Sequence, residues 1–220
     1  MVIKEVKNLC FDLLKEKLVP LGYKPLKKGL EFTKLNDLGF DKIWFGTTEY
    51  AHLKMYKIYI YVSVRIDAVE QLNQHAHEFH DESQIYREPT CNINCGAFTG
   101  NPNLEFEIRT PEDVVQAVET FWNIYNEHAV EHIKKCYDIQ FLNSIYPKYG
   151  ERAQDWLVDY GWYFKVFTIA FLANKDTFPT FRKEFTDYLI NDLNFPEDVQ
   201  QDIDVFLNKI TSENSKNNNG

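Results

Sequence analysis

The feature that most constrains the fold is a strict alternation of side-chain character in residues 57–66. Isoleucine or valine occupies every second position, and the positions between them carry Lys, Tyr, Ser or Arg. A two-residue period of this length predicts an antiparallel strand with one face in the core and the other toward solvent. Tyr59 and Tyr61 belong to the outward set, and we expect them to offer an uncovered aromatic platform to a protein partner.

Weaker strand signals surround this segment, at residues 30–35, 42–48, 91–98 and 104–108. In the last of these, Leu104, Phe106 and Ile108 should face the core. Glu105 and Glu107 alternate with them and should face solvent. The sheet is therefore expected to have about five strands.

Helical periodicity occupies the rest of the chain. The spacing of apolar residues predicts helices over 2–18, 67–79, 111–135, 153–173, 178–193 and 196–211. Asp67 followed by Glu70 predicts an N-cap with its capping-box partner. Thr110, with Pro111 and Asp113 after it, predicts the start of the long third helix.

The order of these elements predicts an α+β fold. It consists of an N-terminal helix, an antiparallel sheet with helices packed on one face, and a C-terminal three-helix extension. We expect residues 1–147 to form the α+β domain, residues 148–211 the extension packed on it, and residues 212–220 a flexible polar tail. Aromatic side chains on all sides of the 153–173 helix predict that other helices surround it.

Charge and hydropathy exclude several classes of function. The net charge is −9, divided into +2 for residues 1–80 and −11 for residues 81–220, so a nucleic-acid partner is not expected. No apolar segment is long enough for a membrane span, and the N-terminus lacks a secretory signal, so we expect a cytoplasmic protein without membrane contact. The four cysteines are scattered, and Cys91 and Cys95 do not have zinc-knuckle spacing, so buried thiols are expected.

One motif has the pattern of a catalytic site. His128, Glu131 and His132 match H-x-x-E-H, in which two histidines on a helix bind zinc and the glutamate activates water. Angular spacing on a helix places His132 in the apolar stripe, His128 at its edge and Glu131 on the polar side, which weakens this hypothesis. The sequence does not choose a third ligand among Asp155, Asp159, Glu184 and Asp187.

Two passages resemble a group of small, uncharacterised bacterial α+β domains. The first is residues 18–32, with Leu-Val-Pro-Leu-Gly-Tyr and then Lys-Lys-Gly-Leu-Glu-Phe, and the second is residues 106–113, Phe-Glu-Ile-Arg-Thr-Pro-Glu-Asp. The likeness covers about residues 5–147 and excludes the last three helices. Some similar domains occur among immunity proteins encoded beside interbacterial toxins, so the resemblance implies a protein-binding role. The group has no assigned catalytic residues to carry over to this chain.

These observations support three hypotheses about function. The leading one is an intracellular protein-binding module, more specifically an immunity protein that neutralises a toxin, without a cofactor. Its partner-binding surface is predicted to include Glu105, Glu107, Glu112 and Asp113, because acidic side chains suit a basic nuclease cleft. A zinc-dependent hydrolase with His128 and His132 as ligands is the second hypothesis, and a small-molecule-binding or scaffold domain using the tyrosine face is the third.

Overall fold

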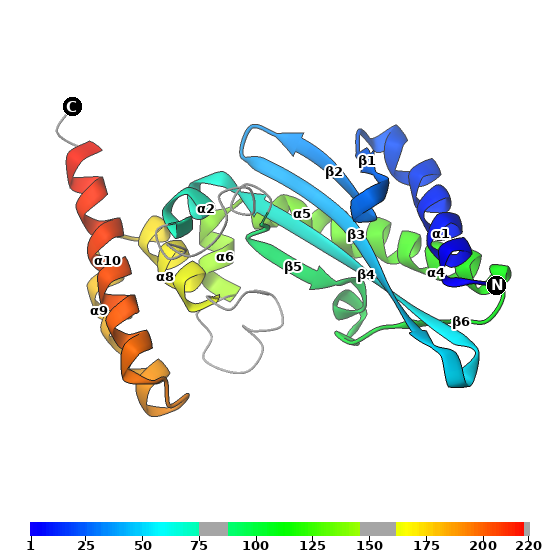
Figure 1. Cartoon of the computed structure of the whole chain (residues 1–220). Helices are drawn as coiled ribbons and strands as arrows, with labels where there is room; N and C mark the ends of the chain where they lie inside the picture. Colours follow the sequence, from blue (N-terminus) through cyan, green and yellow to red (C-terminus); the bar gives the residue numbers. More distant parts are fainter. Residues whose placement is uncertain (75–87, 146–161, 218–220) are drawn as a thin grey trace. The chain divides into compact units, whose positions relative to one another are not determined.

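The computed structural model describes residues 1–74, 88–145 and 162–217, with side chains up to residue 212. The fold is α+β, as predicted: an N-terminal helix, an antiparallel sheet and then several helices (Figure 1). The chain divides into two compact units, each built from two stretches of sequence. Unit 1 comprises residues 1–65 and 91–135, and unit 2 comprises residues 66–90 and 136–220.

Within the described residues the sheet has six strands, in the order β1-β2-β3-β4-β5, and β6 also pairs with β4. Their bounds are β1 Lys24–Leu26, β2 Glu31–Asn36, β3 Gly39–Tyr50, β4 Met55–Ile66, β5 Cys91–Asn94 and β6 Phe106–Ile108. The alternating segment is β4, and each of the four weaker signals also contains a strand. The expectation that one face of β4 meets solvent is wrong at Ser63 and Arg65, which are buried where β4 pairs with β5 or continues beyond that pairing. Strand β1 was not predicted, because three residues that include Pro25 are too few to show a period.

The predicted strand over residues 91–98 is wrong in its second half. β5 ends at Asn94, and the 3₁₀ helix η5, Cys95–Thr99, follows. The Asn94 side chain accepts a hydrogen bond from the Gly96 backbone N–H at 2.9 Å, which turns the chain into that helix. A Cβ atom at Gly96 would lie 2.2 Å from the Asn101 carbonyl oxygen, so the turn requires glycine.

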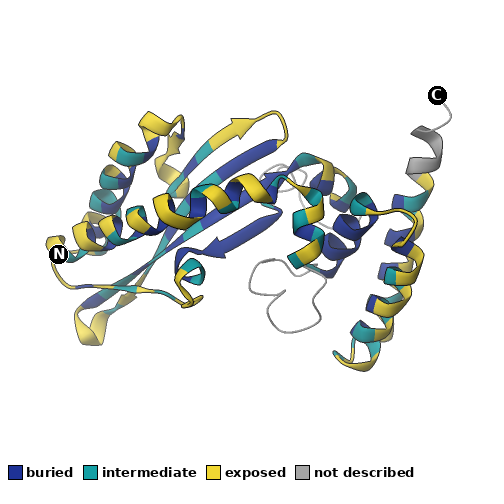
Figure 2. Cartoon of the chain, turned by 180° about the vertical axis from the view of Figure 1, so that it is seen from behind, coloured by how far each residue is buried: buried dark blue, intermediate teal, exposed yellow. Residues whose placement is uncertain are grey.

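Two helices of unit 1 cover one face of the sheet, as Figures 1 and 2 show from opposite sides. They are α1 Ile3–Leu18 and α4 Pro111–Ile124. Their buried side chains meet the apolar face of the strands, which includes Ile43, Ile58 and Ile60. Short 3₁₀ helices η1 Val19–Leu21, η2 Lys27–Gly29 and η3 Ala51–Leu53 lie in the connections.

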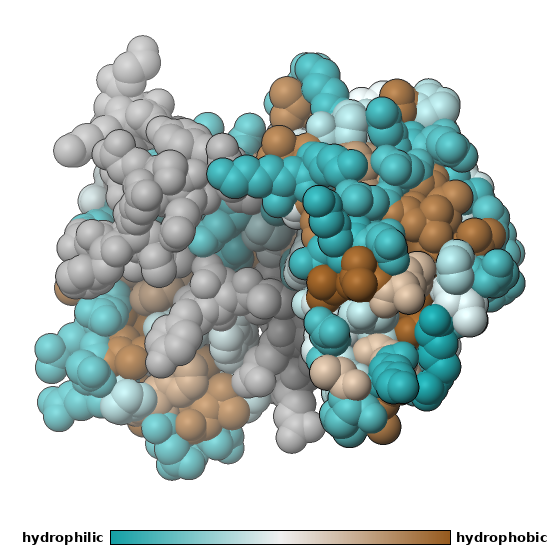
Figure 3. Space-filling model, turned by 45° about the vertical axis from the view of Figure 1, so that its right-hand side comes forward, coloured by the Kyte–Doolittle hydropathy of each residue, from teal (hydrophilic) through white to brown (hydrophobic). Residues whose placement is uncertain are grey.

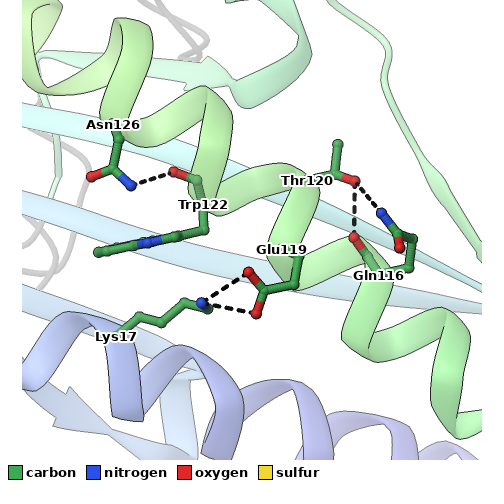
Figure 4. Close-up of polar contacts among 6 residues, drawn as sticks. All are labelled: Lys17, Gln116, Glu119, Thr120, Trp122 and Asn126. Atoms are coloured by element: carbon green, nitrogen blue, oxygen red, sulfur yellow. Dashed lines mark hydrogen bonds and ion pairs between the residues drawn. The ribbon is translucent and has the colours of Figure 1, made fainter.

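The two covering helices also share a polar contact on their outer side (Figure 4). Lys17 Nζ of α1 lies 2.9 Å from Glu119 Oε1 of α4 and 5.2 Å from the centre of the Trp122 ring. Trp122 in turn stacks on Tyr125, whose hydroxyl group hydrogen-bonds to that of Tyr23 at 3.1 Å. A partly exposed ion pair thus accompanies the apolar packing of α1 against α4.

The predicted long helix is present, but its middle is not α-helical. After α4, a π-helical segment, Tyr125–Ala129, leads into α5, Val130–Cys136. Every member of the predicted apolar stripe is buried: Val114, Val118, Phe121, Tyr125, Ala129, Ile133 and Cys136. Thr110 is the N-cap, and its side chain accepts from the Asp113 N–H, so the predicted capping box is confirmed.

The other predicted cap is wrong. Helix α2, Asp67–Asn73, takes Ile66 as its N-cap, which has no side-chain capping bond, and Asp67 is already the first helical residue. Glu70 is buried, and its Oε1 lies 3.6 Å from Lys165 Nζ. Its carboxylate group therefore pairs with this buried cation and does not cap the helix. The remainder of the helix predicted to residue 79 falls mostly outside the described residues.

Unit 2 is helical. Besides α2 it contains α6 Ile139–Ile145, α8 Trp162–Ala173, α9 Phe178–Asn191 and α10 Glu197–Asn217. Helix α8 contacts the other four, and its residues 163–171 are all buried, as predicted from the aromatic side chains on all its sides. The prediction also included residues 153–161, which lie outside the described part, and missed α6. Helix α10 continues to Asn217, past the predicted end at residue 211.

A candidate binding face on the sheet

The face of the sheet opposite α1 and α4 carries a group of aromatic side chains. Trp44 comes from β3, and Tyr59 and Tyr61 come from β4. Each is flanked in sequence by buried residues such as Ile43 and Ile60, so strand alternation directs the aromatic rings to the other side. All three are partly exposed. We call these three residues the aromatic platform.

The rings of the platform have a defined mutual geometry. Trp44 stacks on Tyr61 with ring centres 4.5 Å apart and planes 7° apart. Tyr59 is nearly perpendicular to both rings, at 81° to Tyr61 and 87° to Trp44. Its ring lies over Gly46 of β3, since a Cβ atom there would stand 2.1 Å from Tyr59 Cε2.

Buried polar groups hold the platform in place. Asn92 Oδ1 of β5 accepts hydrogen bonds from Trp44 Nε1 at 2.9 Å and from the Ser63 hydroxyl group at 2.6 Å. Asn94, opposite Tyr61 in the ladder, donates through Nδ2 to the Leu104 carbonyl oxygen at 3.1 Å. The platform is therefore fixed before any partner binds, which lowers the entropy cost of binding.

A hollow of about 320 Å³ adjoins the two tyrosines, and its lining also includes Asn94, Asn103 and Glu105. Asn103 and Glu105 come from the passage between η5 and β6. Glu105 Oε2 forms an ion pair with Lys57 Nζ at 2.5 Å, and 37 % of the Glu105 side chain is exposed. The Lys57 ammonium group also lies 5.3 Å from the centre of the Tyr50 ring.

The structure brings three of the six predicted partner-binding residues together, because Tyr59, Tyr61 and Glu105 line one hollow. Glu107 is exposed on β6, opposite Lys57 in the ladder. Glu112 is exposed in the first turn of α4. Whether these acidic residues contact a partner stays a prediction.

Asp113 has a structural role at the start of α4. Its Oδ2 accepts hydrogen bonds from the backbone N–H groups of Arg109 and Thr110, each at 2.8 Å. These two bonds hold the pKa of the Asp113 carboxyl group below its ordinary value, the bond from Arg109 having the larger effect.

Sequence reasoning missed Trp44, Asn92, Asn94 and Asn103. Trp44 lies within the strand predicted over residues 42–48, and its alternation with Ile43 and Phe45 is the local signal that could have placed it on the outer face. The link to Tyr61 depends on the pairing of β3 with β4, which no local pattern contains.

The H-x-x-E-H motif lies where the π-helical segment joins α5. His132 is half-buried with its ring 5.3 Å from the Phe98 ring, whereas His128 and Glu131 are exposed. Burial, with a smaller effect from Lys135, lowers the pKa of His132 from 6.5 to about 4. Glu131 Oε1 lies 3.9 Å from Lys135 Nζ. The motif thus combines a neutral histidine near the core with two solvated side chains.

The described residues do not identify a third zinc ligand. Of the four predicted candidates, Glu184 and Asp187 belong to unit 2, and Asp155 and Asp159 lie outside the described residues. Within residues 1–74, 88–145 and 162–217, no group of three or more His, Cys, Asp or Glu side chains could hold a metal ion. The zinc hypothesis stays a prediction, tested by zinc content before and after His132→Ala.

Compared with protein-family models, curated proteins and solved structures, the chain has no match. The resemblance of residues 5–147 to small bacterial domains therefore stays an expectation from the residues alone. Among the helices of the described segments, none combines the length and apolar character needed to cross a membrane.

Proposed function

We propose that the protein is a protein-binding module and that the aromatic platform is its contact surface. The observation that carries the proposal is the fixed, partly exposed arrangement of Trp44, Tyr59 and Tyr61 on the sheet face opposite α1 and α4. Tyrosine and tryptophan are the residues that most often dominate binding energy at protein interfaces. Side chains already held by stacking and hydrogen bonds lose little entropy on binding.

Polar side chains beside the aromatic platform also suit a protein partner. On the face drawn in Figure 3, apolar side chains stand among polar ones. Interfaces of non-obligate complexes have this mixed character, with an aromatic centre and a polar rim. Lys57, Glu105 and Glu107 would belong to that rim.

A more specific proposal is that the partner is a basic toxin, neutralised by occlusion. It is supported by the resemblance to immunity proteins and by the distribution of charge. Unit 1 holds 15 Lys and Arg against 14 Asp and Glu, a net charge of +1, whereas unit 2 holds 9 against 19, a net charge of −10. A basic partner would be attracted over a long range by the net charge of −9 of the whole chain, and the platform would supply short-range contacts.

The test is site-specific photo-crosslinking in the native cell, followed by reconstitution. A photoreactive phenylalanine analogue at position 61 should crosslink a partner that the analogue at position 188 does not. Tyr188 is the control because it is a partly exposed aromatic residue of α9 in unit 2. The purified partner should bind the wild-type chain at least about tenfold more tightly than Tyr59→Ala/Tyr61→Ala, an effect typical of losing interface hot spots.

Equal affinity of the purified partner for the wild-type chain and the folded double variant would show the proposal to be wrong. For the toxin proposal, the partner alone should arrest growth when expressed. Co-expression of the wild-type chain should restore growth, and the double variant should not. A partner without toxicity would rule out the immunity role and leave the binding proposal standing.

The third hypothesis, a small-molecule site, would use the same hollow. A volume of about 320 Å³ lies at the small end of the range for such sites. Native mass spectrometry of the purified chain tests it, since a retained ligand would add its mass to the expected 26.0 kDa.

A further inference from the structure

Two tyrosine rings meet at a right-angled corner beside the hollow, and this corner limits the chemistry of what can bind. The planes of Tyr59 and Tyr61 are 81° apart with ring centres at 5.9 Å, and both residues line the hollow. The faces of aromatic rings carry partial negative charge and attract cations. A group that enters the hollow therefore lies beside two tyrosine rings, and a cation that contacts an open face of either ring would be attracted to it.

The remaining lining strengthens this preference. Glu105 adds a carboxylate group, and Asn94 and Asn103 add amides, whereas none of the five lining residues is cationic. Lys57, the cation paired with Glu105, is not among the residues that line the hollow, so an anionic ligand would meet a carboxylate there and no cationic lining residue. A purely apolar group would remove the exposed part of the Glu105 carboxylate from water, which costs free energy.

Lys57, a cationic residue of this chain, lies beside the hollow because it pairs with Glu105. Lys57 Nζ pairs with Glu105 Oε2 and also lies over the Tyr50 ring. Carboxylate and tyrosine together thus hold an ammonium group at this end of the sheet. The hollow likewise combines the Glu105 carboxylate with tyrosine rings, those of Tyr59 and Tyr61, and is open to a second cation.

We infer that the hollow receives the guanidinium group of an arginine side chain presented by the protein partner. This inference rests on the proposed function, because it names the chemistry of the partner at the platform. Arginine fits better than lysine, since a planar guanidinium group can stack on one ring while its N–H groups donate to Glu105. A volume of about 320 Å³ suits one long side chain.

The test compares two probes of nearly equal shape, N-acetyl-arginine methylamide and N-acetyl-citrulline methylamide. Citrulline replaces the guanidinium group with a neutral urea group. Backbone amide shifts of the full chain are followed by NMR during titration. Arginine should produce saturable shifts at Tyr59, Tyr61 and Asn94 in the millimolar range, and citrulline should bind at least about tenfold more weakly, as expected for loss of a charge-assisted hydrogen bond.

Two substitutions should act in opposite directions. Glu105→Gln removes the carboxylate and should weaken arginine binding at least about fivefold. Lys57→Met removes the competing internal cation and should strengthen it. Glu127→Gln is the control, because it removes an equal charge from the exposed helical side of unit 1 and should change affinity less than about twofold.

Equal binding of the arginine and citrulline probes, or an unchanged affinity in Glu105→Gln, would overturn the inference. So would weaker arginine binding in Lys57→Met. The proposed function fails separately, if Tyr59→Ala/Tyr61→Ala keeps full affinity for the purified partner. Loss of the partner in that double variant, together with equal binding of the two probes, would refute the arginine site and leave the platform as the contact surface.

Discussion

The ring of Tyr59 on β4 lies against the backbone of Gly46 on β3, where any side chain would displace it. A Cβ atom at position 46 would stand 2.1 Å from Cε2, 2.3 Å from Cζ and 2.4 Å from the hydroxyl oxygen of Tyr59. The glycine thus provides the space in which the perpendicular ring of the platform rests. This pairing of an aromatic ring with a cross-strand glycine makes the platform sensitive to one methyl group.

We expect Gly46→Ala to disturb the platform with little loss of stability. The far end of the Tyr59 side chain can rotate away, and alanine in a strand gains about 0.5–1 kcal/mol over glycine through lower backbone entropy in the unfolded chain. The free energy of unfolding should therefore change by less than about 1 kcal/mol, as measured by urea denaturation. Affinity for the purified partner should fall markedly.

A double-mutant cycle checks the cause. In a Tyr59→Ala background, Gly46→Ala should have no further effect on partner affinity, because the displaced ring is already gone. An additive loss would show that Gly46 acts through something other than Tyr59.

The buried ion pair of unit 2 should be costly to break from one side. Lys165 is 2 % exposed, donates to the Pro89 carbonyl oxygen at 2.8 Å and lies 3.6 Å from Glu70 Oε1. Lys165→Met leaves the Glu70 carboxylate buried without its cation, so the free energy of unfolding should fall by about 3 kcal/mol. Chemical denaturation measures this change, with the exposed Lys183→Met of α9 as a control expected within about 0.5 kcal/mol.

Removing both charges should cost less than the sum of the two single changes. We expect Glu70→Gln/Lys165→Met to recover at least about 1 kcal/mol relative to additivity. Strict additivity would mean that the two side chains do not interact energetically, despite their burial.

His132 should make stability depend on pH in mildly acidic solution. Its pKa is about 4 in the folded chain against 6.5 ordinarily, so between these values the unfolded chain binds a proton that the folded chain does not. The free energy of unfolding should thus decrease as the pH falls from 6.5 to 4, and this contribution should not change further below pH 4. Allowing for partial exposure, we expect a loss of about 1–2 kcal/mol.

His132→Gln should flatten the pH dependence of the urea midpoint in that window. His128→Gln, at the exposed histidine of the same motif, should leave the dependence as in the wild-type chain. An unchanged slope in His132→Gln would assign the effect to other groups.

The start of α4 should respond to its cap. Thr110→Ala removes the hydroxyl oxygen that accepts from the Asp113 N–H and should lower the free energy of unfolding by about 1 kcal/mol. Glu112→Gln, an exposed neighbour in the first turn, should change it by less than about 0.5 kcal/mol. Equal effects of the two substitutions in denaturation experiments would contradict the capping role.

Much of the fold was predictable because several local patterns are strong. The two-residue period of residues 57–66 is compatible only with a β-strand. The three- and four-residue spacing from Val114 to Cys136 predicted a buried helical stripe, and all its members are buried in the structure. The missed elements are short or have weak patterns. Strand β1 has three residues, and α6 has seven. The π-helical segment is hidden because a four-residue step keeps Tyr125 and Ala129 in the buried stripe in either helix type.

The misread cap at Asp67 has a different origin. The residue types at positions 67 and 70 fit a capping box. In the structure, however, Glu70 lies within α2 and its side chain contacts Lys165 of α8. The Glu70 carboxylate lies beside the buried ammonium group of Lys165, a residue far from it in the sequence. Local motifs cannot contain such a contact, since its two members are far apart in the chain.

The sequence alone determined that residues 57–66 form a strand and that Tyr59 and Tyr61 lie on the face opposite Ile58 and Ile60, because side-chain direction alternates along any strand. It did not determine that Ser63 and Arg65, on the same face as the tyrosines, are buried. Only the tertiary structure decided what stands beside these tyrosines. Pairing of β4 with β3 brought Trp44 and Gly46 to them, pairing with β5 brought Asn92, and the chain leading into β6 added Glu105. Alternation fixes a direction locally, whereas neighbours across a sheet depend on strand register, which the packing of the whole core selects.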